Sequence, residues 1–176
     1  MALPDSFKVS QGTAIVWGQS GASGVTATLS FNALADAAAR MGASVDLGSD
    51  WDREYAVYPV IETGTAPTAG NTVDFYLVCS HDGTNWPAKV TGSDAAYTLG
   101  TSDANLRQAG PPVTSLIATN DGNTVLRQAP VIWRPQGRYV TPIADNNLGQ
   151  AIRNETTATD NDSRLIIVPL IDKVID

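Results

Sequence analysis

The residues that could support catalysis are few, because the chain contains a single histidine and a single cysteine. Cys79 and His81 lie two residues apart, so on a strand their side chains would share a face. One interpretation is a Cys–His nucleophilic pair. The other, which we favour, is a core cysteine beside a histidine at the end of the strand. The sequence contains no nucleophile elbow, phosphate loop or dinucleotide fingerprint, so we expect no enzyme, no catalytic residue and no cofactor.

Two acidic segments contain oxygen ligands of the kind that Ca²⁺ prefers. The first is Asp-Asn-Asp at 160–162, near Glu155, and the second is Asp-Asn-Asn at 145–147. Neither matches the spacing of a twelve-residue calcium loop, and for both we favour a solvated loop and expect no metal site. The region 154–163 also contains two Asn-x-Thr/Ser sequences, which we interpret as chance matches. Whether this loop binds a cation or a glycan stays open.

The four tryptophans, at positions 17, 51, 86 and 133, could form a surface that stacks on sugar rings if several were exposed together. Trp86 is the best candidate, since it follows the turn dipeptide Asp82-Gly83 in a loop after a strand. The alternative, which we favour, places the rings in the core or at the base of loops. Aromatic rings with one polar atom also suit protein interfaces, so we name Trp86 and Trp133 as candidate contact residues.

The chain is acidic, with 11 basic and 18 acidic residues and a formal net charge of -7. A surface of this sign repels phosphate, so we expect neither a nucleic acid nor an anionic membrane as a partner. No apolar run reaches the 18 residues of a membrane span, and the first residues lack the features of a signal peptide. A single cysteine excludes an internal disulfide and fits folding in a reducing cytoplasm.

The elements that would position these residues are predicted to be β-strands. Apolar and polar residues alternate over 25–31 and 73–79, which predicts two half-buried strands. The segments 54–62 and 165–171 are apolar on both faces and are predicted to be covered on both sides. Shorter candidates lie at 13–17, 44–47, 113–118, 125–133 and 139–143, and the longest region without periodicity is 80–110. Nine or ten short strands separated by turns predict an all-β fold, an antiparallel sandwich or barrel.

Three local features refine this prediction. Residues 32–41 are rich in alanine between Asn32, a possible cap, and Gly42, which favours at most one short helix there; an irregular corner between strands is the competing interpretation. The loop at 64–70 joins two predicted strands, most simply as a hairpin. Pro59, Pro130 and Pro169 fall inside strand candidates, and each predicts an edge, a bulge or a bend.

The chain is predicted to consist of an N-terminal arm, residues 1–11, and one sandwich domain, residues 12–176. Leu3, Phe7 and Val9 are apolar positions of the arm, and Pro4 discourages an early helix. A free arm would expose these side chains, so it should dock on a neighbouring molecule or on its own sheet. We therefore name Leu3, Phe7 and Val9 as further candidate contact residues.

Several segments resemble small virion proteins that tailed bacteriophages encode beside their capsid genes. The similarity extends from about residue 12 to residue 170 and is one of strand-and-turn texture. Its segments are LSFNALA at 29–35, VDLG at 45–48, ETGTAPTAGNTVDFYL at 62–77, SHDGTNW at 80–86, NLR at 105–107 and GRYV at 137–140.

This resemblance implies a jelly-roll-like β-sandwich of the head decoration, or cement, type. Proteins of that type sit on the capsid exterior and clamp neighbouring major capsid subunits, after synthesis in the host bacterial cytoplasm. The expected partners are the major capsid protein and further copies of this chain, with a closed homotrimer favoured. No catalytic residue belongs to the family pattern. The alternatives are a sandwich protein of the neck or tail of the virion, and a carbohydrate-binding β-sandwich.

Overall fold

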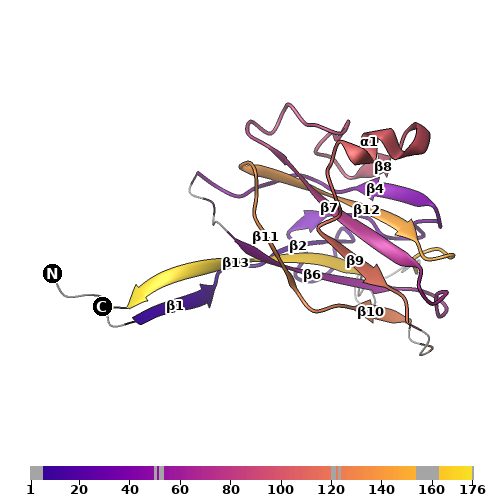
Figure 1. Cartoon of the computed structure of the whole chain (residues 1–176), viewed down its shortest axis with the longest axis horizontal. Helices are drawn as coiled ribbons and strands as arrows, with labels where there is room; N and C mark the ends of the chain where they lie inside the picture. The colour runs from indigo at the N-terminus through magenta and orange to yellow at the C-terminus, as the bar shows by residue number, and fades with distance from the viewer. Residues whose placement is uncertain are drawn as a thin grey trace.

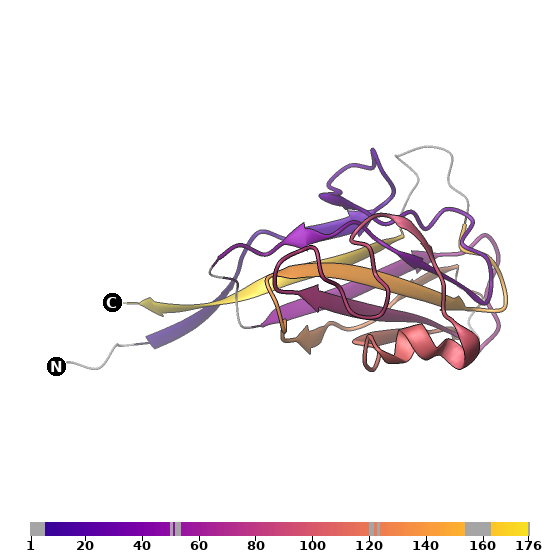
Figure 2. The ribbon, with the colours of Figure 1, turned by 90° about the horizontal axis from the view of Figure 1, so that it is seen from above.

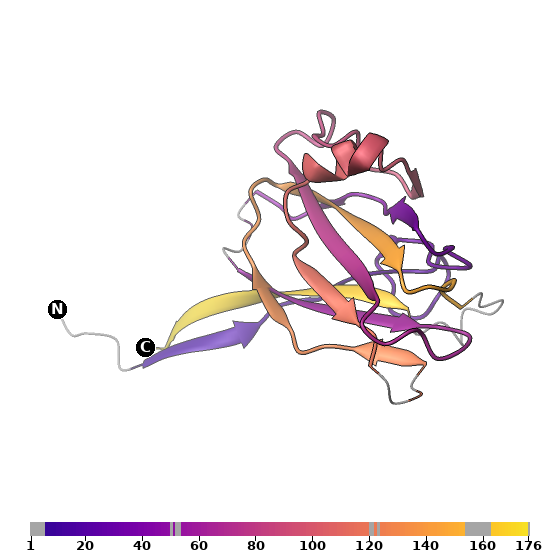
Figure 3. The same ribbon diagram turned by 45° about the vertical axis from the view of Figure 1, so that its right-hand side comes forward.

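The computed structural model describes residues 6–49, 51, 54–119, 122, 124–153 and 163–175. Two β-sheets lie face to face with a hydrophobic core between them (Figure 3). The first sheet contains β1 (Ser6–Gln11), β2 (Ile15–Gly18), β3 (Ala27–Thr28), β6 (Tyr55–Glu62), β10 (Val125–Arg127), β11 (Val131–Trp133) and β13 (Arg164–Ile175). The second contains β4 (Ala38–Met41), β5 (Val45–Asp46), β7 (Thr72–Ser80), β8 (Ala95–Tyr97), β9 (Thr114–Ile117) and β12 (Tyr139–Asn147).

The strand order is that of a jelly roll. The first sheet runs β10-β6-β13-β2-β3 and the second runs β8-β4-β12-β7-β9. Among the main strands taken in chain order, the first pairs with the last (β2 with β13), and β4 pairs with β12. These pairings are antiparallel, and the short β2–β3 contact is parallel. The predicted all-β antiparallel sandwich with a jelly-roll-like order is confirmed.

Period-two alternation explains how the sheets pack. On β7, Val73, Phe75 and Leu77 face the core between the sheets, whereas Tyr76 and Val78 face outward. The predicted strands at 54–62 and 73–79 are confirmed as β6 and β7, and that at 165–171 forms part of β13. The alternating segment 25–31 pairs only at β3; of its apolar members, Leu29 and Phe31 are buried, and the other two are half-buried.

The aperiodic region after β7 forms a cover over the outer face of the second sheet. It leaves β7, adds β8 to the edge of β4, and returns to β9 through a 3₁₀ turn, η1 (Thr101–Asp103), and the short helix α1 (Ala104–Arg107) (Figure 1). Ala88, Val90 and Leu106 pack there against Tyr76 and Val78 in a second, smaller core. The region lacks periodicity because isolated side chains, rather than one regular face, provide this packing.

Two predictions of local structure are wrong. The single short helix lies at Ala104–Arg107, whereas residues 32–41 form turns followed by β4, which is the predicted alternative of a corner between strands. Ala33 and Ala37 have φ angles of 52° and 55°, which no α-helix accommodates. The loop 64–70 does not close a hairpin, because β6 belongs to the first sheet and β7 to the second.

Candidate functional site

The terminal strands form a two-stranded ribbon that extends away from the sandwich (Figures 1 and 2). Strand β1 pairs with the outer half of β13, from Gln11 opposite Leu170 to Ser6 opposite Ile175. On the body, β6 pairs with β13 only as far as Pro169. Beyond Leu170, β13 has β1 as its single strand partner among the described residues. The predicted arm is thus one strand of a ribbon whose other strand continues into the centre of the first sheet.

The backbone register shows which groups of the ribbon are free. The N–H of Gly12 donates to the carbonyl of Pro169 at 2.9 Å, so residue 12 faces β13. Backbone groups alternate in an antiparallel pair, and residues 8 and 10 therefore also face β13, whereas 7, 9 and 11 face away from it. On the other side of the ribbon, residues 172 and 174 face outward by the same argument. Each edge of the ribbon carries backbone groups without a partner in the described parts of the chain.

A β-bulge lies where the ribbon joins the body. Between the pairs Gln11–Leu170 and Ile15–Ile167, the chain that runs from β1 into β2 has three residues, whereas β13 has two. An extra residue on one strand bends the pair and increases its twist. The bulge therefore sets the direction in which the ribbon leaves the sandwich.

The predicted contact residues of the arm fall in two places. Phe7 and Val9 lie in β1, opposite Val174 and Asp172 respectively. Leu3 lies outside the described residues, as does the acidic segment 160–162.

Trp86 anchors a loop. The carboxylate of Asp82 accepts hydrogen bonds from the N–H groups of Thr84 and Asn85 at 2.9 and 2.8 Å, which fixes the turn. The indole N–H of Trp86 then donates to the carbonyl of Gly83 at 3.1 Å. The half-buried ring of Trp86 packs against the second, smaller core. Its ring and polar atom are thus both engaged within the chain.

Trp133, at the end of β11 in the first sheet, lines a groove together with Val113. Its half-buried ring packs against the main core, with a ring-centroid distance of 5.9 Å to Tyr55. The groove has a volume of about 620 Å³, and its apolar lining includes Leu77 and Ile132. Ile132 is 55% exposed and adds apolar surface to the groove. Trp17 is fully buried, and Trp86 packs against the second, smaller core rather than the main core. Trp17, Trp86 and Trp133 therefore do not form one stacking surface.

The cysteine and the histidine do not form a reactive pair. Cys79 is half-buried against the main core, and burial raises the pKa of its thiol. His81 follows the last residue of β7 and is exposed. A thiol with a raised pKa stays protonated at neutral pH, so it is not an activated nucleophile.

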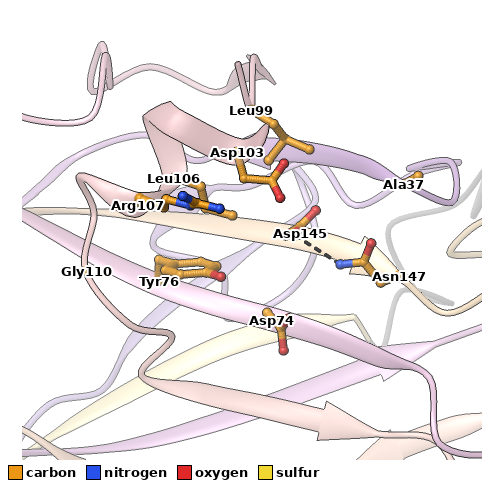
Figure 4. A pocket seen from close by; sticks show the side chains of 10 residues that line it. All are labelled: Ala37, Asp74, Tyr76, Leu99, Asp103, Leu106, Arg107, Gly110, Asp145 and Asn147. Atoms are coloured by element: carbon orange, nitrogen blue, oxygen red, sulfur yellow. Dashed lines mark hydrogen bonds between the residues drawn. The ribbon is translucent and has the colours of Figure 1, made fainter. Parts of the chain in front are cut away.

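An acidic hollow lies on the outer face of the second sheet, beside α1 (Figure 4). Its volume is about 460 Å³, and it brings together Asp74 of β7, Asp145 of β12 and Asp103 of η1. Asp145 is predicted to lie in a solvated loop; it instead lies in β12, two residues before the strand ends, and is 7% exposed. The sequence-based predictions named neither Asp74 nor Asp103 as a site residue. For Asp74 the available signal was its place on the polar face of the predicted strand at 73–79.

Burial changes the ionisation of this hollow. Burial raises the pKa of Asp145, and the negative charges of Asp74 and Asp103 add to that effect. The pKa of Tyr76 is raised to about 12, first by burial and then by Asp74, Asp145 and Asp103. Among the described residues, no three acidic, histidine or cysteine side chains are arranged to hold a metal ion.

Three comparisons with known proteins, by family model, by curated sequence and by solved structure, give no match. In the part of the chain that the structure describes, no helix has the length and apolar character that a membrane span requires.

Proposed function

We propose that this protein is a structural protein of a tailed-bacteriophage virion, a decoration protein that clamps neighbouring major capsid subunits on the outside of the head. The observation that carries the proposal is the ribbon of β1 and β13, with its two free backbone edges. Free edges of this kind are templates for adding a strand from another chain. A neighbouring subunit that supplies such a strand is held through main-chain hydrogen bonds.

The attachment of the ribbon suits a clamp that carries load. Strand β13 is 12 residues long, and its inner half lies between β2 and β6 in the first sheet. A force on the ribbon therefore passes directly into a central strand rather than into a surface loop. Each inter-subunit contact can be weak, because several copies acting together multiply the effect.

The charge of the chain agrees with an exterior position. A net charge of -7 disfavours contact with packaged DNA. A closed symmetric assembly, a homotrimer in our proposal, would place three ribbons around one local symmetry axis of the shell.

Reconstruction of intact particles tests the location, and edge variants test the mechanism. Val9→Pro removes a backbone donor on the outward edge and keeps the donors that face β13; Val9→Thr is the matched control. We expect density for the chain on the head exterior, and lower heat resistance of heads decorated with Val9→Pro than with Val9→Thr. Density at the neck or tail instead would replace the head assignment with the neck-or-tail alternative, and equal heat resistance would contradict clamping through the ribbon edge.

A further inference from the structure

The floor of the acidic hollow contains two like charges in direct opposition. Asp74 and Asp145 are register partners on adjacent antiparallel strands, and like charges in this position repel each other. Asp103 adds a third carboxylate from the turn before α1. No ion pair within the described residues joins any of the three to a cation, including Arg107, whose side chain also lines the hollow (Figure 4). The negative charge of the hollow is thus only partly balanced.

A second feature, independent of the charge count, is an unmet hydrogen-bond acceptor. Asp145 is 7% exposed, and its Oδ2 accepts a hydrogen bond from the side chain of Asn147 at 3.0 Å. Its Oδ1 is buried and accepts no hydrogen bond from any described residue. A buried carboxylate oxygen without a donor is costly, and a bound donor would remove that cost. Figure 4 shows the Asp145 carboxylate beside Asn147 and below Asp103.

The walls of the hollow indicate the class of ligand. Leu99 and Leu106 supply apolar surface, and the ring of Tyr76 lines the same hollow, below Arg107 in Figure 4. A volume of about 460 Å³ exceeds what a metal ion needs. Apolar walls suit an aliphatic stem, an aromatic ring suits a delocalised cation, and a planar guanidinium donates to two carboxylates at once.

We propose that the acidic hollow binds a guanidinium group, either of a free arginine derivative or of an arginine side chain of a partner protein. Asp145 and Asp74 accept hydrogen bonds from the guanidinium, and the aliphatic stem lies along Leu99 and Leu106. This site is separate from the ribbon and does not depend on the proposed capsid role.

Titration of the ¹⁵N-labelled full chain with Nα-acetyl-arginine amide, followed by amide chemical shifts, tests the proposal. The shifts of Asp74, Tyr76 and Asp145 should move and saturate. Nα-acetyl-norleucine amide is the neutral control, and calcium chloride and Nα-acetyl-lysine amide are the competing cations. The peptide Gly-Ser-Arg-Ser-Gly separates the two sources, because tighter binding of the peptide than of the amide indicates a partner's side chain.

Two charge-matched variants sharpen the test. Asp145→Asn keeps the shape of the side chain and should weaken arginine amide binding about tenfold or more. Glu54→Gln removes the same charge from the exposed pair with Arg134 and should leave binding unchanged. Arg107→Gln removes the competing cation of the hollow and should strengthen binding. The proposal would be overturned by equal losses for Asp145→Asn and Glu54→Gln, or by equal shifts with the norleucine control. Tighter binding of calcium or of the lysine amide than of the arginine amide would also overturn it. A dispersed amide spectrum of each variant confirms that the variant is folded.

Discussion

Two arginine–aspartate pairs with the same geometry differ in their burial. Arg40 donates through Nε and Nη2 to Asp94 at 2.7 and 2.9 Å, and Arg138 donates through the same atoms to Asp46 at 2.7 and 2.6 Å. The Asp94 side chain is 16% exposed against 41% for Asp46, and it also accepts from the hydroxyl and N–H of Ser30. The two pairs therefore share their arginine geometry but differ in burial and in the further donors that their carboxylates accept.

We expect Asp94→Ala to lower the free energy of unfolding by about 3 kcal/mol, because it leaves Arg40 and the donors of Ser30 without their acceptor. Asp46→Ala should cost clearly less, since water replaces the lost partner at an exposed site. Urea denaturation at pH 7, followed by tryptophan fluorescence, measures both. Equal losses would show that neither the burial of Asp94 nor its hydrogen bonds from Ser30 add to stability.

The same aspartate predicts a pH dependence. Burial opposes ionisation of Asp94, but the hydrogen bonds from Arg40 and Ser30 outweigh it, and the pKa of the carboxyl is lowered. A lowered pKa in the folded state stabilises the fold above the pKa of the unfolded chain, about 3.9, and this contribution disappears as the pH falls through the folded pKa. The stability difference between the wild type and Asp94→Asn should therefore be full at pH 7 and smaller at pH 3. Urea denaturation at both pH values checks this, and an undiminished difference at pH 3 would contradict it.

At the scale of the elements, each sheet has a proline in a central strand. In each case the proline lies opposite a gap between two short strands that pair with that central strand. Pro59 of β6 lies at the interval between β10 and β11, and Pro142 of β12 lies at the interval between β4 and β5. The carbonyl of Pro142 accepts from the N–H of Gly42 at 2.9 Å, so Pro142 faces that interval. The missing proline donors thus fall where the neighbouring strand is broken. Pro169, for which an edge, a bulge or a bend is predicted, lies opposite Gly12 at the base of the ribbon, where the extra residue is on the other strand; Pro130 lies between β10 and β11.

Asn146 connects β12 to two segments, the turn before β4 and the turn that follows β12. Its side-chain amide donates to the carbonyls of Leu34, Ala35 and Gln150 at 2.9 to 3.0 Å, and its oxygen accepts from the N–H of Leu148. We expect Asn146→Ala to lower the free energy of unfolding by about 3 kcal/mol, because it removes every hydrogen bond of a fully buried side chain and leaves the N–H of Leu148 without its acceptor. Asn147→Ala, on the exposed side of the same strand, removes one hydrogen bond, to Asp145, and should cost clearly less. Urea denaturation distinguishes the two, and similar effects would show that the amide network is not needed.

These elements also show what the sequence could predict. Alternation over 73–79 indicates a strand, because one face must meet the core while the other does not. Alanine propensity at 38–41 instead favours a helix, and pairing with β8 and β12 overrides it. The opposition of Asp74 and Asp145 depends on the register of strands far apart in the chain, which local pattern does not determine. The same limit applies to the ribbon, whose apolar strand is visible in the sequence and whose partner is not.

For the molecule as a whole, the free edges of the ribbon predict how copies assemble. We expect the full chain to form a closed homotrimer, because a symmetric ring lets each ribbon edge meet a neighbouring copy and leaves no end for further growth. Light scattering after size-exclusion chromatography, from about 1 to 100 µM protein, should give three times the mass of the single chain, with dissociation at the lowest concentrations.

The edge variants connect this assembly to the ribbon rather than to the sandwich. Val9→Pro should shift the mass toward the single chain, whereas Val9→Thr should keep the trimer, because only proline removes the outward backbone donor. At the lowest concentrations, where both variants are single chains, the thermal unfolding of the sandwich should be the same, since the donors at residues 8 and 10 still face β13. Identical masses for the wild type and Val9→Pro at every concentration would show that copies do not meet at this edge. The groove beside Trp133, with its exposed Ile132, would then be the surface to test by substitution.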